Sequence, residues 1–192
     1  MGFGVLFRMS ARMDFTVSVL DYQFISLILS PFLTSIFSTF ASMYELNFPR
    51  YSFRFKNSEN KTFVLDLLRK KFVLLSPEEW VRQNVIQFLM TEKKYPKHLL
   101  NAEKKLVING LTKRYDLIAF HPTGKVNLIV ECKSPTVKIN QESFDQIARY
   151  NLVVSAEYLM VTNGLQHYYC QMDYPNKKYK FLPELPEYVR KS

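Results

Sequence analysis

Two apolar runs with a turn between them stand out in the middle of the chain. The first covers residues 115–120 and is apolar apart from one acid, and the second covers residues 126–130. The segment between them contains Pro122, which fixes φ, and Gly124, which can take a positive φ. Apolar runs of this length, bounded by turn residues, predict strands that are buried on both faces. The pattern therefore predicts an antiparallel hairpin at the centre of the fold.

Further elements are expected on both sides of this hairpin. Residues 51–67 should form a strand, a turn and a second strand, and a short apolar run follows at 72–75. The remaining elements are, in order, a helix from Pro77 to about Lys93, a strand at 103–108, a tight turn at Asn109-Gly110, the hairpin, a helix at 141–155, strands at 158–162 and 166–172, and an edge strand at 179–182. This order predicts an α/β fold with a central mixed sheet flanked by helices and an N-terminal β-hairpin.

The first helix has a strong start signal and an amphipathic pattern. Ser76 should cap it, Pro77 takes the first helical position and Glu79 completes a capping box. Its core stripe consists of four apolar residues at helical spacing, Val81, Val85, Phe88 and Leu89. Three polar residues lie on or beside the opposite face, namely Glu79, Arg82 and Gln83.

The first 42 residues differ in composition from the rest of the chain. Tyr22–Tyr44 carries no charged side chain and is long enough to span a bilayer, although Pro31 and many Ser and Thr residues weigh against a membrane segment. A second explanation is that residues 1–42 are translated from upstream of a true start at Met43. We therefore divide the chain into an extension, 1–42, and a domain, 43–192, and expect the domain to be cytoplasmic and not bound to a membrane.

Composition narrows the choice of partner. The net charge of +9 and the pI near 9.5 favour a polyanion such as nucleic acid. Hydrophobic residues make up 47% of the chain, which is typical of a globular domain and not of a disordered one. The two cysteines, Cys132 and Cys170, are too few for a disulfide scaffold or a zinc site.

Candidate catalytic residues lie at the ends of the two central strands. Asp116 is near the start of the first strand, and Glu131 and Lys133 are at the end of the second. The side chains of Glu131 and Lys133 alternate to one face, roughly 7 Å apart along the strand. Two carboxylates, with the Cys132 backbone carbonyl as a further ligand, suit one or two Mg²⁺ or Mn²⁺ ions. Such an ion activates water for attack on a phosphodiester, and the lysine either orients or deprotonates that water or neutralises the phosphate.

The pairing register of the hairpin decides whether this site can form. Directly opposed residues of an antiparallel pair have residue numbers with a constant sum, and they project to the same face. Pairing Phe120 with Asn127 gives an odd sum and sets Asp116 opposite Glu131, whereas pairing Phe120 with Val126 gives an even sum and turns Glu131 away. The apolar pattern does not choose between the two registers. The chemistry predicts the odd sum or a bulge that shifts one strand.

Longer motifs carry a resemblance to a known family. The acid on one strand and E-C-K on the next resemble the PD-(D/E)xK nuclease core, and Gln146 with Tyr150 looks like the Q-x3-Y motif of RecB-like nucleases. The segments SPEEWVRQ, NGLTKRYDLIAF, LIVECKSP, FDQIARYN and YLMVTNG together resemble the small family related to the N-terminal nuclease domain of the R subunit of type I restriction enzymes. The resemblance covers about Met43 to Tyr188.

This resemblance implies a restriction-endonuclease-like core and a role for each motif residue. By resemblance, Asp116 and Glu131 are metal ligands, Lys133 is the catalytic lysine, Gln146 and Tyr150 are an accessory pair near the substrate phosphate, and Glu79 is a possible extra ligand. The sequence departs from the family pattern at Tyr115, where the superfamily motif has proline. That proline shapes the backbone and takes no part in the chemistry.

Two functions follow for the domain. The first is Mg²⁺-dependent hydrolysis of DNA, in which Lys104, Lys105, Lys113 and Arg114 contact phosphates. The second is a non-catalytic nucleic-acid-binding or assembly module on the same fold. No G-x4-G-K-[ST] phosphate loop occurs, so the chain carries no helicase motor. Motor or specificity subunits, or a second copy of the chain, are the expected protein partners, and no small-molecule cofactor is expected.

Overall fold

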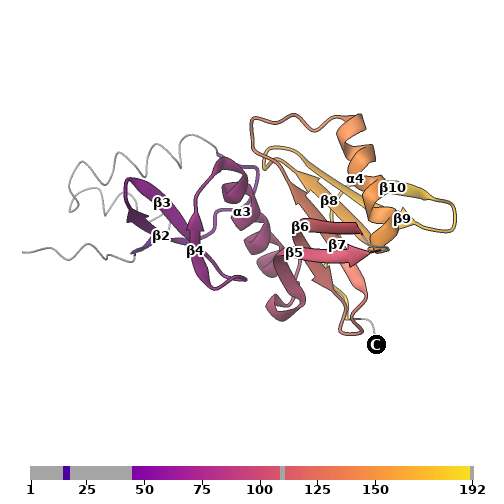
Figure 1. Cartoon of the computed structure of the whole chain (residues 1–192), viewed down its shortest axis with the longest axis horizontal. Coiled ribbons are helices and arrows are strands. Elements are labelled where there is room, and N and C mark those ends of the chain that lie inside the picture. Colours follow the sequence, from indigo (N-terminus) through magenta and orange to yellow (C-terminus); the bar gives the residue numbers. More distant parts are fainter. Residues whose placement is uncertain (1–14, 18–44, 109–110, 191–192) are drawn as a thin grey trace, which may run out of the picture.

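The computed structural model describes residues 15–17, 45–108 and 111–190 and contains two β-sheets (Figure 1). The smaller sheet is antiparallel, with the strand order β1-β2-β3-β4. Its strands are β1 (Phe15–Val17), β2 (Phe53–Ser58), β3 (Lys61–Asp66) and β4 (Lys71–Leu74). β2 and β3 form the N-terminal hairpin that the sequence predicts, and Glu59 and Asn60 make its turn at positive φ.

The larger sheet is mixed, with the strand order β10-β9-β8-β7-β6-β5. Its strands are β5 (Leu100–Ile108), β6 (Leu111–Phe120), β7 (Val126–Cys132), β8 (Tyr158–Thr162), β9 (His167–Asp173) and β10 (Lys178–Leu182). β7 and β8 are parallel and all other neighbours are antiparallel. A parallel pair needs a crossover connection, which the helix between β7 and β8 supplies.

The two main helices occupy the positions that the sequence pattern predicts. α3 (Pro77–Thr91) lies between the small and the large sheet, and α4 (Gln141–Val154) lies over the other face of the large sheet (Figure 1). A short 3-10 turn, η1 (Lys97–Leu99), leads into β5. The element order α3, β5, β6, β7, α4, β8 and the mixed α/β class are as predicted.

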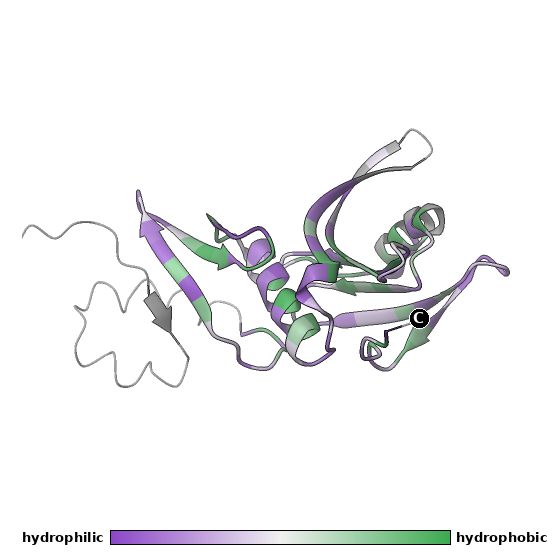
Figure 2. Ribbon diagram, turned by 90° about the horizontal axis from the view of Figure 1, so that it is seen from below, coloured by the Kyte–Doolittle hydropathy of each residue, from purple (hydrophilic) through white to green (hydrophobic). Residues whose placement is uncertain are grey.

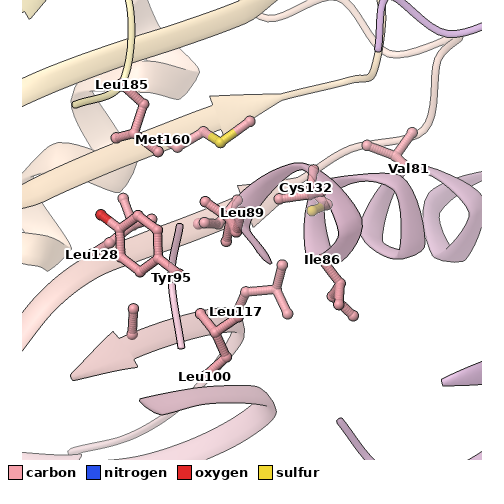
Figure 3. Close-up of a cluster of buried hydrophobic side chains, with 13 residues drawn as sticks. Val81, Ile86, Leu89, Tyr95, Leu100, Leu117, Leu128, Cys132, Met160 and Leu185 are labelled. Carbon is pink, nitrogen blue, oxygen red and sulfur yellow. The ribbon is translucent and has the colours of Figure 1, made fainter. Parts of the chain in front are cut away.

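Each face of the large sheet has its own hydrophobic core. The α3-side cluster joins helix residues such as Val81 and Leu89 to Leu117, Val130 and Cys132 of the sheet. Figure 3 shows Val81, Leu89, Leu117 and Cys132 gathered around the helix. The α4-side cluster has three helix members, Phe144, Ile147 and Ala148, packed on sheet residues that include Tyr115, Ile118 and Ile129. Both faces of β6 and β7 are therefore covered, as their continuous apolar runs predict.

The predicted start of α3 is confirmed, and the polar face opposite its core stripe is buried as well. The Ser76 hydroxyl accepts a hydrogen bond from the Glu79 backbone N–H, and Pro77 is the first helical residue. Val81, Val85 and Leu89 are fully buried, as expected. Glu79, Arg82 and Gln83 are also buried, because the small sheet, with the turn between β3 and β4, covers the face of α3 that points away from the large sheet. The periodic pattern of a helix reveals its apolar face. It cannot reveal that a second sheet also covers the polar face, because ion pairs satisfy the polar side chains there.

Two further expectations concern the ends of elements. β5 begins at Leu100, ahead of the expected start at Glu103. The predicted Asn109-Gly110 turn lies outside the described residues, as do Tyr22–Tyr44 and most of the extension; three residues of the extension form β1. Within the described ranges, no helix combines the length and apolar character needed to cross a membrane.

Candidate functional site

The site predicted from the sequence lies at a fork in the large sheet. β6 pairs with β7 from Leu117 opposite Val130 to Ala119 opposite Leu128, which is the odd-sum register, and a bulge between Ala119 and Phe120 shifts the strand toward the turn. The predicted odd sum and a bulge are both present, but the ladder ends at Leu117, so Asp116 is not paired with Glu131. Residues 111–115 of β6 pair with β5 alone, so the two strands leave the sheet as a two-stranded arm (Figure 2). Asp116 is the last arm residue before β6 joins β7, and Glu131 follows the last residue of β7 that pairs with β6.

The β6 strand turns over at Asp116. Tyr115 packs in the α4-side cluster and Leu117 in the α3-side cluster, although residues two apart in a regular strand share a face. On the neighbouring strand, Glu103 has a φ of 51°, and no pairing joins Glu103 to Asp116 between the regular pairs on either side. This local irregularity frees the Asp116 side chain from strict alternation and lets it point toward α3.

Both carboxylate oxygens of Asp116 are held by hydrogen bonds. Oδ2 accepts from the backbone N–H of Cys132 at 2.8 Å, and Oδ1 accepts from Nη2 of Arg82 at 2.8 Å. The first hydrogen bond connects Asp116, where the arm begins, to the end of β7. The second hydrogen bond connects Asp116 to α3. Asp116 thus joins three elements that the sequence separates widely, with its side chain 17% exposed.

Glu131 and Lys133 form an ion pair beyond the fork. Lys133 Nζ donates to Glu131 Oε1 at 2.9 Å, and alternation along β7 places both side chains on the side of Ile129. Asp116 points toward α3 instead, so the two carboxylates do not project to the one face that the sequence predicted. Burial alone would lower the pKa of Lys133. The hydrogen bond to Glu131 and the electrostatic attraction to Glu131, Asp116 and Glu78 outweigh burial and raise that pKa above its ordinary value. Lys133 therefore carries a positive charge at neutral pH and interacts with three carboxylates.

Glu78 is a site residue that the sequence reasoning missed. Burial raises its pKa, and so does repulsion from Asp116 and Glu131, while Arg82 and Lys133 act in the opposite direction. Its Oε1 accepts from Arg82 Nη2 at 3.1 Å, and its side chain is 46% exposed. The i,i+4 spacing of Glu78 and Arg82 on a helix is the sequence signal that could have revealed Glu78.

Glu79, the helix residue that the resemblance suggested as an extra ligand, points away from the fork. Its Oε1 accepts from Arg69 Nη2 at 2.6 Å and from Gln83 Nε2 at 2.8 Å, and its Oε2 accepts from Arg82 Nη1. All of these donors come from the protein interior. Of these two glutamates, Glu78 is therefore the one that lies near Asp116 and Lys133.

A buried ion-pair network extends from the fork to the small sheet. Arg69, in the turn after β3, donates to Asp66 at 2.6 Å, to Glu79 at 2.6 Å and to Glu103 at 2.8 Å. Across the network and the fork, six carboxylates meet four cations. The carboxylates are Asp66, Glu78, Glu79, Glu103, Asp116 and Glu131, and the cations are Arg69, Arg82, Arg114 and Lys133. Among these ion-paired groups of the described residues, the formal excess is two negative charges.

The donor set fits magnesium as proteins usually bind it. Mg²⁺ keeps several waters and takes one or two carboxylates together with substrate phosphates, so it needs no complete protein cage. Asp116 and Glu131 carry hard oxygen donors of this kind at the fork, Asp116 directed toward α3 and Glu131 on the side of Ile129. In the described part of the chain, no three Asp, Glu, His or Cys side chains are already gathered closely enough to hold an ion. Cys132 is fully buried and burial raises the pKa of its thiol well above the ordinary value, so its sulfur is not a donor for the fork.

The remaining predicted residues fall into two groups. Lys104, Lys105 and Arg114 are exposed on the arm; Lys105 lies directly opposite Arg114, and Lys104 Nζ lies 5.9 Å from the centre of the Phe120 ring. Gln146 and Tyr150 lie on α4, and Lys113 lies on β6. The side chains of these last three residues are outside the described part of the structure, so their proposed roles stay predictions.

Comparison with known proteins supports the resemblance. No curated protein matches the chain. The family described as type I restriction enzyme R protein N terminus matches residues 77–186, which is more than half of the chain and runs from the first residue of α3 to beyond β10. The matched range includes both strands of the fork and both main helices. The chain belongs to the family of type I restriction enzyme R protein N termini.

Proposed function

We propose that this protein is a metal-dependent nuclease that hydrolyses phosphodiester bonds in DNA, with a restriction-endonuclease-like core of the PD-(D/E)xK superfamily. The observation that carries the proposal is the fork, where Asp116 meets the E-C-K sequence at the end of β7. Membership of the restriction-enzyme family supports the same interpretation. The excess of carboxylates over cations in this region supports a role for a divalent ion.

Each residue at the fork has a proposed task. Asp116 and Glu131 would hold Mg²⁺ or Mn²⁺, with the Cys132 carbonyl and Glu78 as further oxygen donors. When bound, the ion supplies a Lewis acid and an activated water for attack on phosphorus. Lys133 stays protonated beside Glu131, which favours neutralising the scissile phosphate over removing a proton from water. Gln146 and Tyr150 are proposed to contact the phosphate from α4.

The arm supplies the proposed contacts to the DNA backbone. Like charges directly opposed on two strands repel each other, and Lys105 and Arg114 are such a pair. A phosphate placed between them would relieve this repulsion. Their strands lead directly to Asp116, so DNA that contacts the arm reaches the fork.

One observation favours the second candidate, a nucleic-acid-binding or assembly module without turnover. Arg82 and Lys133 already neutralise Asp116 and Glu131 through short ion pairs. Such pairs suffice to hold the fork together in a protein that only binds DNA, or that only docks on a motor or specificity subunit.

A cleavage assay on single-stranded, duplex, branched and modified DNA separates the two candidates. The full chain is incubated with each substrate in Mg²⁺, in Mn²⁺ and in a chelator, and binding is measured in parallel. Cleavage that requires the metal supports the nuclease. DNA binding that is equal with and without metal, and no cleavage of any substrate, would replace it with the binding module.

A further inference from the structure

We infer that Arg82 is a positioning residue for Asp116, and that Arg69 supports Arg82 in this role through Glu79. The inference rests on the proposed function, because it assigns the side chains that set the geometry of the proposed metal ligand. It also extends the site beyond the part of the chain that matches the family, since Arg69 precedes residue 77.

The first step is the contact between Arg82 and the fork. Nη2 of Arg82 donates to Asp116 Oδ1 at 2.8 Å and to Glu78 Oε1 at 3.1 Å, so one nitrogen bridges a carboxylate of β6 and a carboxylate of α3. The guanidinium is planar and has donors in fixed directions, so it orients a carboxylate in a way that a lysine ammonium cannot. Burial would lower the pKa of Arg82, but Asp116 and Glu79 raise it, so the charge is permanent.

The second step is the support behind Arg82. Its Nη1 donates to Glu79 Oε2, and the other oxygen of Glu79 accepts from Arg69 and Gln83. Arg69 is held in turn by Asp66, whose Oδ1 also caps the backbone N–H groups of Leu68 and Arg69 at 2.7 Å. The relay therefore starts in the turn after β3 of the small sheet and ends on the carboxylate at the fork.

A purely structural role explains this arrangement poorly. Nε of Arg82 is buried and has no hydrogen-bond partner among the described residues. Burying an arginine with an unsatisfied donor costs free energy, and well-packed apolar side chains often stabilise such a position better than buried charges do. The arrangement is better explained by what Arg82 does at its other end, where it fixes the direction of Asp116.

Lysine variants test the inference because they keep the positive charge and remove the planar set of donors. Arg82→Lys and Arg69→Lys are made in the full chain, with the exposed Arg50→Lys as the matched control. Mn²⁺ binding is measured by electron paramagnetic resonance without DNA, and kcat and KM are measured with Mg²⁺ on the DNA that the wild type cleaves best. Folding is followed by thermal unfolding.

Loss of a residue that orients a metal ligand typically costs about 10–100-fold in metal affinity or activity. We expect Arg82→Lys to weaken Mn²⁺ binding and lower kcat by this amount, with KM for DNA unchanged because Arg82 does not contact the substrate. Arg69→Lys should act in the same direction with a smaller effect. The double variant should lose little beyond Arg82→Lys, because both residues act through one path. Arg50→Lys should match the wild type.

Two results would overturn the inference. One is a pair of folded lysine variants that bind Mn²⁺ and turn over like the wild type. The other is loss of the folded state in both variants, which would assign the relay to stability alone. Failure of the proposed function looks different, since the wild type itself would then neither bind Mn²⁺ nor cleave DNA.

Discussion

The carboxylate of Asp116 accepts a hydrogen bond from the backbone N–H of Cys132 at 2.8 Å, at the point where β6 separates from β7. Beyond this point β7 keeps β8 as a neighbour but loses β6, so the Cys132 N–H lacks a strand partner on that side. The side chain of Asp116 takes the place of the missing strand. The acid that we propose as a metal ligand is therefore also the group that closes the sheet at its fork.

The first prediction concerns the two proposed metal ligands. Asp116→Asn and Glu131→Gln keep the shape of each side chain and remove its charge. We expect metal-dependent cleavage to fall to background in both, because an amide is a much poorer ligand for Mg²⁺ than a carboxylate. Cleavage rates and circular dichroism are measured together, with the surface variant Asp173→Asn as control. Turnover near the wild-type rate in either variant would rule out that residue as a ligand.

The sequence predicted the register of the hairpin because the proposed chemistry and the register constrain each other. Both strands are apolar on both faces, so only the need to bring Asp116 alongside Glu131 selected the odd-sum register, and the structure has that register. The turn of the strand at Asp116 was not predictable, since it depends on the positive φ of Glu103 on a neighbouring strand.

The sequence did not predict that the polar face of α3 is buried, for a related reason. Helical periodicity places Glu79, Arg82 and Gln83 away from the core stripe, and isolated helices expose such a face. Here the turn after β3 supplies Asp66 and Arg69 to that face, so the polar residues are buried and paired. The pairing joins residues that are far apart in the sequence and share no periodic pattern.

The second prediction concerns the arm. Lys105→Gln and Arg114→Gln should each weaken binding to DNA and lower the slope of log affinity against log salt by about 1, because each removes one phosphate contact. Lys180→Gln is the control, since β10 is at the opposite edge of the sheet from β5. Binding is measured by fluorescence anisotropy over a range of salt concentrations. A slope that is the same in all three variants and the wild type would remove the arm from the DNA interface.

The third prediction concerns alkaline pH. Burial raises the pKa of Cys170 from 9.0 to about 12, and burial with repulsion from Glu184 raises that of Tyr169 from 10.0 to about 12. Both groups are neutral in the fold and ionise more easily in the unfolded chain. Their contribution to the free energy of unfolding is complete below about pH 9 and is lost as the pH rises toward 12.

Urea unfolding between pH 7 and pH 11 tests this, and the midpoint should fall steadily above about pH 9. Cys170 and Cys132 should also fail to react with a thiol reagent at pH 8 until the protein unfolds, because both are fully buried. A rising midpoint at alkaline pH, or rapid labelling of the folded protein, would contradict the burial of these groups.

The fourth prediction concerns the extension. Residues 43–192 should fold without it, because β1 contributes only three pairs to the edge of the small sheet and the described core clusters contain no residue before Leu46. Circular dichroism and thermal unfolding of the truncated chain are compared with those of the full chain. An insoluble or unfolded product would make the extension a required part of the domain.

The fifth prediction separates two adjacent glutamates of α3. Glu78 faces the fork, where burial and repulsion from Asp116 raise its pKa, so its charge is unfavourable in the protein without metal. Glu78→Gln should therefore leave the thermal midpoint at or above that of the wild type while it weakens Mn²⁺ binding.

Glu79 lies one residue further along the helix and has the opposite role. It accepts hydrogen bonds from Arg69, Gln83 and Arg82 in the interior, and removing one partner of a buried ion pair costs about 3–5 kcal/mol. Glu79→Gln should lower the thermal midpoint by several degrees, because both arginines lose charge compensation. The two variants change the same charge at neighbouring positions, so a difference in net charge cannot explain opposite effects on stability. If Glu78→Gln proved the destabilising change and Glu79→Gln the one that left stability intact, the orientation of this helix end would be reversed and Glu79 would be the residue at the fork.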